Sequence, residues 1–191
     1  MELVSLPQRG KGRATREGVL RARGNVVFLC DADLSMPPHT LDAFMQSAED
    51  VDVVVGSREA PGAQRIGEPW HRHLMGRVFN RLVQILAVPG VHDTQCGFKA
   101  FRRAAAEDLF SRQTLTGWGF DVEILYLARK YGYRIAELPI QWYFDADTRV
   151  RPGTDTISML RELVMIRLRD FQGRYSRPRT SSVSEGDRVG R

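Results

Sequence analysis

The sequence predicts an α/β fold in which helices alternate with the strands of a mostly parallel sheet. Short apolar runs rich in β-branched residues occur at 25–30 and 51–56, and an amphipathic stretch bounded by turn residues precedes each of them. The hydrophobic content of 42% over 191 residues is enough for one domain with a substantial core. In such a domain, ligands bind at the carboxyl ends of the strands.

The first predicted elements surround a glycine-rich turn. Leu3–Leu6 is a short apolar segment that we interpret as a strand, and residues 10–12 form the turn. Residues 13–23 contain apolar positions among arginines and no proline, which predicts a helix that Gly24 ends. The run at 25–30 is short and apolar throughout, as expected of a buried parallel strand.

A second helix and strand follow. Ser35 and two nearby prolines mark a helix start, with apolar residues at helical spacing up to residue 45. Residues 51–58 are predicted to form another buried strand. The stretch 71–86 carries apolar side chains at helical spacing among arginines and histidines, which predicts a basic amphipathic helix.

The second half of the chain repeats these signals less regularly. The predicted elements are a strand at the end of the segment 93–101, a helix at 120–131, a strand at 133–142 that Pro139 interrupts, and a helix at 157–171. Residues 173–191 contain few apolar side chains, which predicts a disordered basic tail after a domain at residues 1–172.

The net charge of the chain limits the chemical classes of partner that it favours. The net charge of +5 favours anionic partners such as phosphates, acidic lipid surfaces or nucleic acid. No nucleic-acid-reading motif is recognisable, so we expect no nucleic-acid partner. Cys30 and Cys96 lack the spacing of a zinc site or a disulfide framework, which favours a reducing, cytoplasmic setting. No apolar run approaches the ~20 residues that a membrane span needs.

Two aspartates, one residue apart, directly follow the strand predicted at 25–30. Asp31 and Asp33 fall where parallel sheets bind ligands, and alternate residues of an extended chain point the same way. Carboxylates suit Mg²⁺ or Mn²⁺, which complete their coordination with water and substrate phosphates. The alternative is that the pair only satisfies a turn and caps the next helix.

Two basic residues are candidates for binding anions. Lys11 lies in a glycine turn at a helix start, where backbone N–H groups favour an anion, although the pattern is not a Walker A loop. Arg58 ends a predicted strand, and guanidinium groups bind phosphate oxygens bidentately. The alternatives are a turn that only begins a helix and a solvated surface arginine.

Read in order, the segments "GKGRATREGVLRARG", "FLCDADLS", "VVVGSR" and "DTQCGFKAFRR", followed by "FDVE", resemble the dolichyl-phosphate β-glucosyltransferase type of family 2 glycosyltransferases. The resemblance covers residues 3–171, and "DTQCGFK" with "FDVE" is its most specific part. It implies a GT-A (Rossmann-like) fold and inverting transfer of a hexose, glucose in these enzymes, from a nucleotide-diphosphate sugar to a polyprenyl (dolichyl) phosphate. It also implies a peripheral protein at the cytoplasmic face of a membrane.

The resemblance assigns roles to individual residues. Asp31 and Asp33 are the implied ligands of Mg²⁺ or Mn²⁺, and Asp93 and Asp121 are two unranked candidates for a general base. A phosphate monoester has its second pKa near ~6, so deprotonating this nucleophile demands little. The residues implied to contact donor or acceptor are Lys11, Gly12, Arg58, Arg72, Gln95, Lys99 and Arg149.

The beginning of the sequence departs from the family pattern. Family members start with a strand and an acidic turn of the kind "PAYNE", then a helix and a second strand, and these segments bind the nucleotide base and ribose. This sequence shows no counterpart, so we expect a GT-A domain that lacks its first βαβ segment. The alternative function is that of a non-catalytic fragment which retains the metal and acceptor half of such an enzyme.

Overall fold

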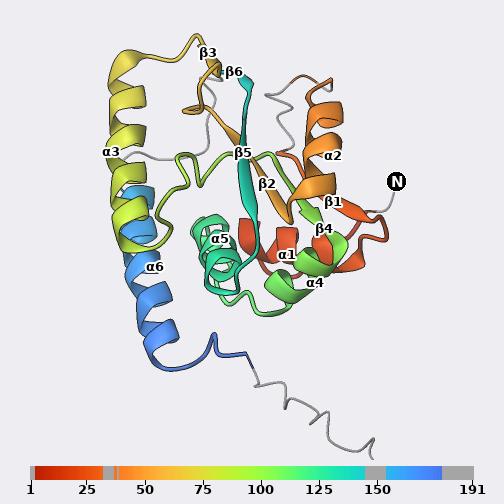
Figure 1. Cartoon of the computed structure of the whole chain (residues 1–191). Coiled ribbons are helices and arrows are strands. Elements are labelled where there is room, and N and C mark those ends of the chain that lie inside the picture. The colour runs from red at the N-terminus through yellow and green to blue at the C-terminus, as the bar shows by residue number, and fades with distance from the viewer. Residues whose placement is uncertain (1–2, 32–36, 38, 145–153, 178–191) are drawn as a thin grey trace, which may run out of the picture.

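The computed structural model describes residues 3–31, 37, 39–144 and 154–177 (Figure 1). In chain order the elements are α1 (Lys11–Arg21), β1 (Val26–Leu29), α2 (Thr40–Asp50), β2 (Val53–Ser57), β3 (Gln64–Ile66), α3 (Trp70–Leu86), β4 (Lys99–Arg102), α4 (Arg103–Ser111), α5 (Phe120–Lys130), β5 (Ile135–Pro139), β6 (Gln141–Tyr143) and α6 (Thr154–Phe171).

The main sheet has four strands in the order β1-β4-β2-β5. β4 pairs antiparallel with both β1 and β2, whereas β2 and β5 pair in parallel. Three strands therefore run in one direction, as predicted, and β4 opposes them. Because β4 lies between β1 and β2, the main sheet is mixed: only β2 and β5 pair in parallel, and β1, which the sequence predicts as a parallel strand, pairs with the antiparallel β4. β3 and β6 form a separate parallel pair beyond the carboxyl end of β2.

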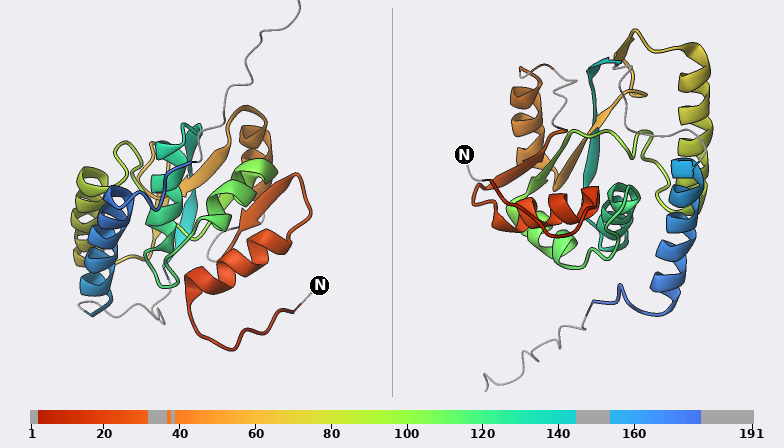
Figure 2. Two further views of the ribbon diagram at one scale, coloured as in Figure 1. Left: turned by 90° about the horizontal axis from the view of Figure 1, so that it is seen from below. Right: turned by 180° about the vertical axis from the view of Figure 1, so that it is seen from behind.

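Helices cover both faces of the main sheet (Figures 1 and 2). Because successive strand residues point to opposite faces, Val53 and Val55 of β2 belong to the larger core cluster with α4 and α5, while Val54 packs with Phe44 of α2. All four side chains are fully buried. The result is a three-layer α/β domain with α2 on one face and α1, α4 and α5 on the other.

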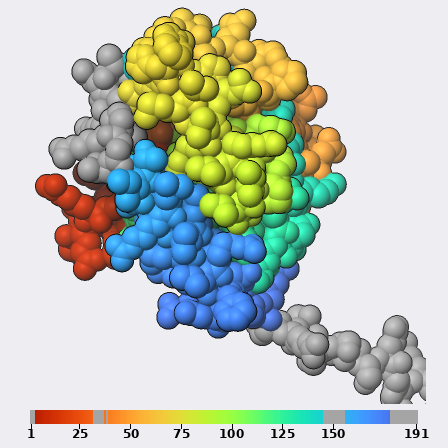
Figure 3. Space-filling model, turned by 90° about the vertical axis from the view of Figure 1, so that its left-hand side faces the viewer, coloured from red at the N-terminus to blue at the C-terminus, as the bar shows by residue number. Residues whose placement is uncertain are grey.

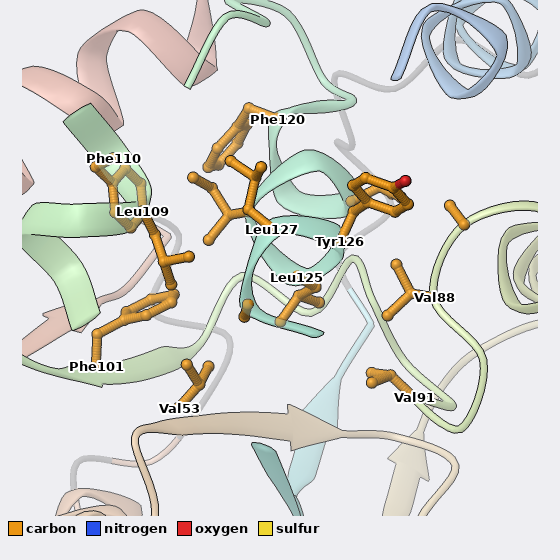
Figure 4. Close-up of a cluster of buried hydrophobic side chains, with 14 of the residues drawn as sticks. Val53, Val88, Val91, Phe101, Leu109, Phe110, Phe120, Leu125, Tyr126 and Leu127 are labelled. Carbon is orange, nitrogen blue, oxygen red and sulfur yellow. The ribbon is translucent and has the colours of Figure 1, made fainter. Parts of the chain in front are cut away.

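The larger core surrounds α5, whose residues 120–128 are all buried. In Figure 4 its side chains face Leu109 and Phe110 on one side and Val88 and Val91 on the other. A helix that is buried all round has no solvated face for polar residues. Asp121 and Glu123 lie within this stretch, so each needs partners inside the protein.

Glu123 finds its partners in the segments at either side of α5. It accepts hydrogen bonds from the backbone N–H groups of Thr114 and Leu115, and from the hydroxyl of Tyr175 at 2.5 Å. Burial and this carboxylate raise the pKa of Tyr175 above its usual value. Because Tyr175 is fully buried in the larger core, packed structure continues past the boundary expected at residue 172.

Most predicted elements are present, and three differences have local causes. The prediction of a strand at Leu3–Leu6 is wrong, since this segment is not in a sheet and Leu3 is exposed. The sequence does not predict β3, because the strand is too short to give a period. It does not predict α4 either, because this helix follows β4 with no turn residue between them. The helix start expected at Ser35 lies outside the described residues.

Candidate functional site

A groove of about 430 Å³ runs between α1 and the edge strand β1. The stripe of α1 that faces it consists largely of small side chains, among them Ala14 and Gly18. Asp31 enters the groove from the carboxyl end of β1, and Asp121 enters from the first turn of α5. Two carboxylates that lie ninety positions apart in the sequence therefore share one opening.

Asp31 is held at the mouth of this groove by its neighbours. The ammonium of Lys11, at the start of α1, lies 2.9 and 3.0 Å from the two carboxylate oxygens. Lys11 also lies 5.3 Å from the ring centroid of Trp118. On the other side, a Cβ added to Gly97 would stand only 2.0 Å from Asp31 Oδ2, so the carboxylate occupies the space that a side chain at position 97 would need.

The donor set at Asp31 fits a divalent cation. Its partly exposed carboxylate already binds one cation, the Lys11 ammonium, and hard ions such as Mg²⁺ and Mn²⁺ need only one or two protein carboxylates when substrate phosphates complete the shell. Asp33, the second predicted ligand, lies outside the described residues. In the part of the chain that the structure describes, no group of three or more His, Cys, Asp or Glu side chains could hold a metal by itself.

Asp121 is fixed from behind by a buried lysine. The ammonium of Lys99 lies 2.6 Å from Asp121 Oδ1 and donates to the carbonyl oxygen of Cys96, also at 2.6 Å. Only 1% of the Lys99 side chain is exposed. Lys99, expected at the substrate, therefore has its charge directed at Asp121.

Arg58 and Asp93 form a two-pronged ion pair at the carboxyl end of β2. Arg58 Nε and Nη2 donate to the two Asp93 oxygens at 2.7 and 2.8 Å, and the Arg58 backbone N–H donates at 2.9 Å. Burial alone would raise the pKa of the Asp93 carboxyl, but the Arg58 charge and hydrogen bonds outweigh it and hold that pKa below its usual value. Asp93 in turn raises the pKa of Arg58, against the effect of burial, so both groups stay charged.

A further carboxylate, that of Glu137, orients this ion pair. Glu137, in the middle of β5, accepts hydrogen bonds from the backbone N–H groups of His92 and Asp93 at 2.9 to 3.0 Å, and from the His92 ring at 2.7 Å. The Glu137 side chain thereby fixes the turn that carries Asp93. Asp93, held on both sides, fixes the direction of the Arg58 guanidinium.

The other predicted contact residues are spread around these two centres. Arg72 lies with its guanidinium 5.1 Å from the ring centroid of Phe144, and Gln95 Nε2 lies 3.9 Å from the sulfur of Met159. Gly12 is buried, and a Cβ there would stand 2.7 Å from the Cβ of Phe120, which indicates a packing role. Arg149 lies outside the described residues.

Sequence reasoning missed three residues that organise the site. Glu137 interrupts an apolar strand, and an acidic residue in that position is a recognisable signal of a buried partner. Trp142 and Phe144 follow it at alternate positions, and both rings contact predicted phosphate-binding arginines. The sequence shows that they share one side of a strand, but it does not show what faces them.

Known proteins resemble this chain in sequence and in structure. The dolichyl-phosphate β-glucosyltransferase of Dictyostelium discoideum is 35% identical over 181 residues, which is 91% of this chain and 55% of the relative. The human enzyme of that name is 32% identical over 95% of this chain and 59% of its own length. This chain thus spans little more than half the length of these relatives.

Solved structures show the same fold. The glucosyl-3-phosphoglycerate synthase of Mycobacterium tuberculosis, in complex with Mn²⁺, uridine diphosphate and phosphoglyceric acid, matches with a TM-score of 0.61 at 18% identity, over 92% of this chain and 57% of that one. The model of glycosyl transferase family 2 matches residues 1–110, which is more than half of the chain. With this match and relatives above 30% identity over nearly its whole length, the chain belongs to glycosyl transferase family 2 and has the GT-A fold.

Proposed function

We propose that this chain carries out inverting transfer of a hexose, glucose by resemblance to its relatives, from a nucleotide-diphosphate sugar to a polyprenyl phosphate. The observation that carries the proposal is the pairing of two centres on one sheet edge. An acidic groove holds Asp31 and Asp121 at the carboxyl end of β1, and a separately oriented arginine, Arg58, follows the carboxyl end of β2, which runs parallel to β1 with β4 between them. Donor and acceptor are both anionic, and such a reaction needs both held close together.

The donor belongs at the acidic groove. Asp31, with Asp33, would hold a Mg²⁺ or Mn²⁺ ion, and that ion would supply Lewis-acid stabilisation of the departing diphosphate. Lys11 lies beside the Asp31 carboxylate and contributes a further positive charge to the same place. The solved relative that binds Mn²⁺ together with uridine diphosphate supports this assignment of the ion.

The acceptor phosphate belongs at Arg58 and Arg72. In the transfer step an oxygen of the acceptor phosphate forms a bond to the anomeric carbon while the bond from that carbon to the donor diphosphate breaks, and the electron pair leaves with the diphosphate. The attacking phosphate is largely dianionic at neutral pH because its second pKa is near ~6. The main task of the arginines is therefore to hold two anions together that would otherwise repel each other.

The two candidate bases have different surroundings, which supports different roles for them. Asp93 uses both oxygens to bind Arg58, and its pKa lies below the usual value, so it is a poor proton acceptor. Asp121 binds Lys99 through Oδ1 and lies in the same groove as Asp31. We assign Asp121 as the group that accepts the proton when the acceptor arrives as a monoanion, and Asp93 as a positioning residue for Arg58.

The transfer assay uses radiolabelled UDP-glucose, dolichyl phosphate and Mn²⁺. Asp31→Asn should slow transfer at neutral pH, whereas Asp121→Asn should slow it mainly below about pH 6, where the acceptor is largely a monoanion that must lose a proton. Asp50→Asn, the same chemical change at an exposed residue at the end of α2, is the matched control. Transfer by Asp31→Asn at the rate of the unsubstituted chain would overturn the proposal. A folded chain that binds Mn²⁺ and phosphate but transfers no glucose would instead support the alternative of a non-catalytic fragment.

We also propose that this protein binds a membrane surface through α3 and α6. None of the described helices is both long and apolar enough to cross a bilayer. α3, described in full, buries only Val83. Figure 3 shows the side of the molecule on which α3 and α6 lie. We define the α3–α6 face by the exposed apolar side chains of these two helices: Trp70, Leu74, Val78 and Ile85 on α3, and Ile157, Val164, Leu168 and Phe171 on α6.

The α3–α6 face combines this apolar surface with positive charge. Arg77 and Arg81 on α3 and Arg161 and Arg167 on α6 are exposed beside the apolar side chains. An amphipathic helix of this kind lies in the plane of a lipid interface, and its arginines are attracted to anionic lipids, which are enriched in the cytoplasmic leaflet. This surface would bring Arg72, on α3, to the depth of a lipid phosphate.

Vesicle sedimentation tests the membrane proposal. Binding to vesicles that contain phosphatidylserine should exceed binding to pure phosphatidylcholine and should weaken as salt screens the arginines. Val78→Glu with Ile85→Glu should abolish it, whereas Met45→Glu, at an exposed position of α2, should not. Equal sedimentation with both kinds of vesicle would contradict the proposal.

A further inference from the structure

Two aromatic rings stand side by side at the end of β6. Trp142 and Phe144 occupy alternate positions of an extended segment, so they project to the same side. Their ring centroids are 5.9 Å apart, and the rings are inclined at 68°. β3 fixes this segment, because Trp142 is in register with Arg65 and the Phe144 backbone N–H donates to the Ile66 carbonyl at 2.9 Å.

Each ring makes a cation–π contact with one arginine. The Arg58 guanidinium carbon lies 5.1 Å from the Trp142 centroid, and that of Arg72 lies 5.1 Å from the Phe144 centroid. Arg58 follows β2 and Arg72 lies in the first turn of α3, so no common element sets their separation. The pair of rings is the structure that connects them.

The two arginines differ in their ion pairs among the described residues. Asp93 neutralises Arg58. Within the described part of the chain, no carboxylate lies within ion-pair distance of Arg72. Glu59 is not available to Arg72, because it binds Arg65 and His73. Among the described residues, Arg72 thus has no carboxylate partner and shares the aromatic pair with a second guanidinium, an arrangement that suits a phosphate group.

We propose that Trp142 and Phe144 are positioning residues that hold Arg58 and Arg72 as a single binding unit for the phosphate monoester of the acceptor. The identity of that anion as the acceptor rests on the proposed function. A ring face orients a guanidinium without using its N–H donors, so those that do not bind Asp93 still point to the ligand. Without the rings, each long side chain would have to be ordered by the phosphate itself, which weakens binding.

Equilibrium binding tests the proposal without any transfer step. The probes are inorganic phosphate, farnesyl phosphate as a soluble prenyl monoester, and uridine diphosphate, each titrated calorimetrically. Trp142→Leu and Phe144→Leu should each weaken farnesyl phosphate binding by about tenfold. Both should leave uridine diphosphate binding unchanged. Tyr143→Leu, on the opposite side of the same strand and about half exposed, is the matched control and should leave all three affinities unchanged.

Two further variants separate positioning from packing. Trp142→Phe keeps a ring face and should retain most of the affinity that Trp142→Leu loses. Arg72→Gln should weaken monoester binding in the unsubstituted chain but have little further effect in the Phe144→Leu background, because the arginine is then no longer held in place.

Five results would count against the proposal, four of them from the substituted chains. The first is a monoester affinity that is unchanged in both leucine variants, and the second is a loss of affinity in Trp142→Phe equal to that in Trp142→Leu. The third is that the effects of Arg72→Gln and Phe144→Leu on monoester affinity are additive. The fourth is a loss of affinity for uridine diphosphate alone, which would assign the arginines to the donor. Inorganic phosphate that binds as tightly as farnesyl phosphate would assign the site to free phosphate and also count against it. Because no outcome depends on glucose transfer, a chain that is inactive in the transfer assay still gives a decisive answer.

Discussion

Gly97→Ala should weaken metal binding while leaving the fold intact. The new Cβ would stand 2.0 Å from Oδ2 and 2.3 Å from Cγ of Asp31. Carbon and oxygen atoms in contact are normally separated by about 3.5 Å, so the carboxylate must move by roughly 1 Å or more. The Gly97 backbone lies outside the left-handed region, so alanine brings no backbone strain there.

The expected effects on stability and on affinity differ in size. Lys11 and Asp31 are each about a third exposed, and a pair of this kind contributes about 0.2–1 kcal/mol. The free energy of unfolding should fall by no more than that amount, because the Asp31 side chain can rotate into the groove. Displacing a ligand-supporting contact typically lowers metal affinity by about 10- to 100-fold.

Mn²⁺ titration in the presence of UDP-glucose measures the affinity, and urea unfolding measures the stability. Gly76→Ala, in the middle of α3, is the control because nothing lies within 4 Å of its added Cβ. It should bind Mn²⁺ normally and gain about 0.5–1 kcal/mol of stability. Unchanged Mn²⁺ affinity in Gly97→Ala would refute the assignment of Asp31 as a metal ligand.

Three further predictions concern buried polar groups. Lys99→Met should cost about 3–5 kcal/mol in urea unfolding because it leaves the Asp121 carboxylate buried and unpaired, and adding Asp121→Leu should recover most of that loss. The pKa of Asp93 is lowered in the folded state, so the Asp93 carboxylate should stabilise the fold relative to Asp93→Asn. This stabilisation should be complete above about pH 5 and should disappear as the pH falls through the folded-state pKa. A difference in melting temperature between the two chains that stays constant down to about pH 2 would contradict this. Tyr175→Phe should cost about 1.5–3 kcal/mol by removing a hydrogen bond to the charged Glu123, and a melting temperature equal to that of the unsubstituted chain would show that Thr114 and Leu115 suffice.

The sequence was sufficient to predict those elements whose signal comes from neighbouring residues. Helices α3 and α5 lie within one residue of their predicted bounds, because a period of three to four residues together with glycine and proline boundaries depends only on neighbouring residues. The same reasoning placed Asp31 at the carboxyl end of a strand. The resemblance contributed the roles of Asp93 and Asp121, which the residues alone could not suggest.

Strand order and side-chain partners were decided only by the tertiary structure. Nothing local in β4 indicates that it runs antiparallel between β1 and β2, because pairing depends on which apolar faces meet across the sheet. Long-range packing likewise brings Glu137 to Asp93 and Trp142 to Arg58 across separations of 44 and 84 residues. The family resemblance implies that Lys99 contacts a substrate, whereas the structure makes Lys99 a buried partner of Asp121, because an all-buried helix must neutralise its own carboxylate.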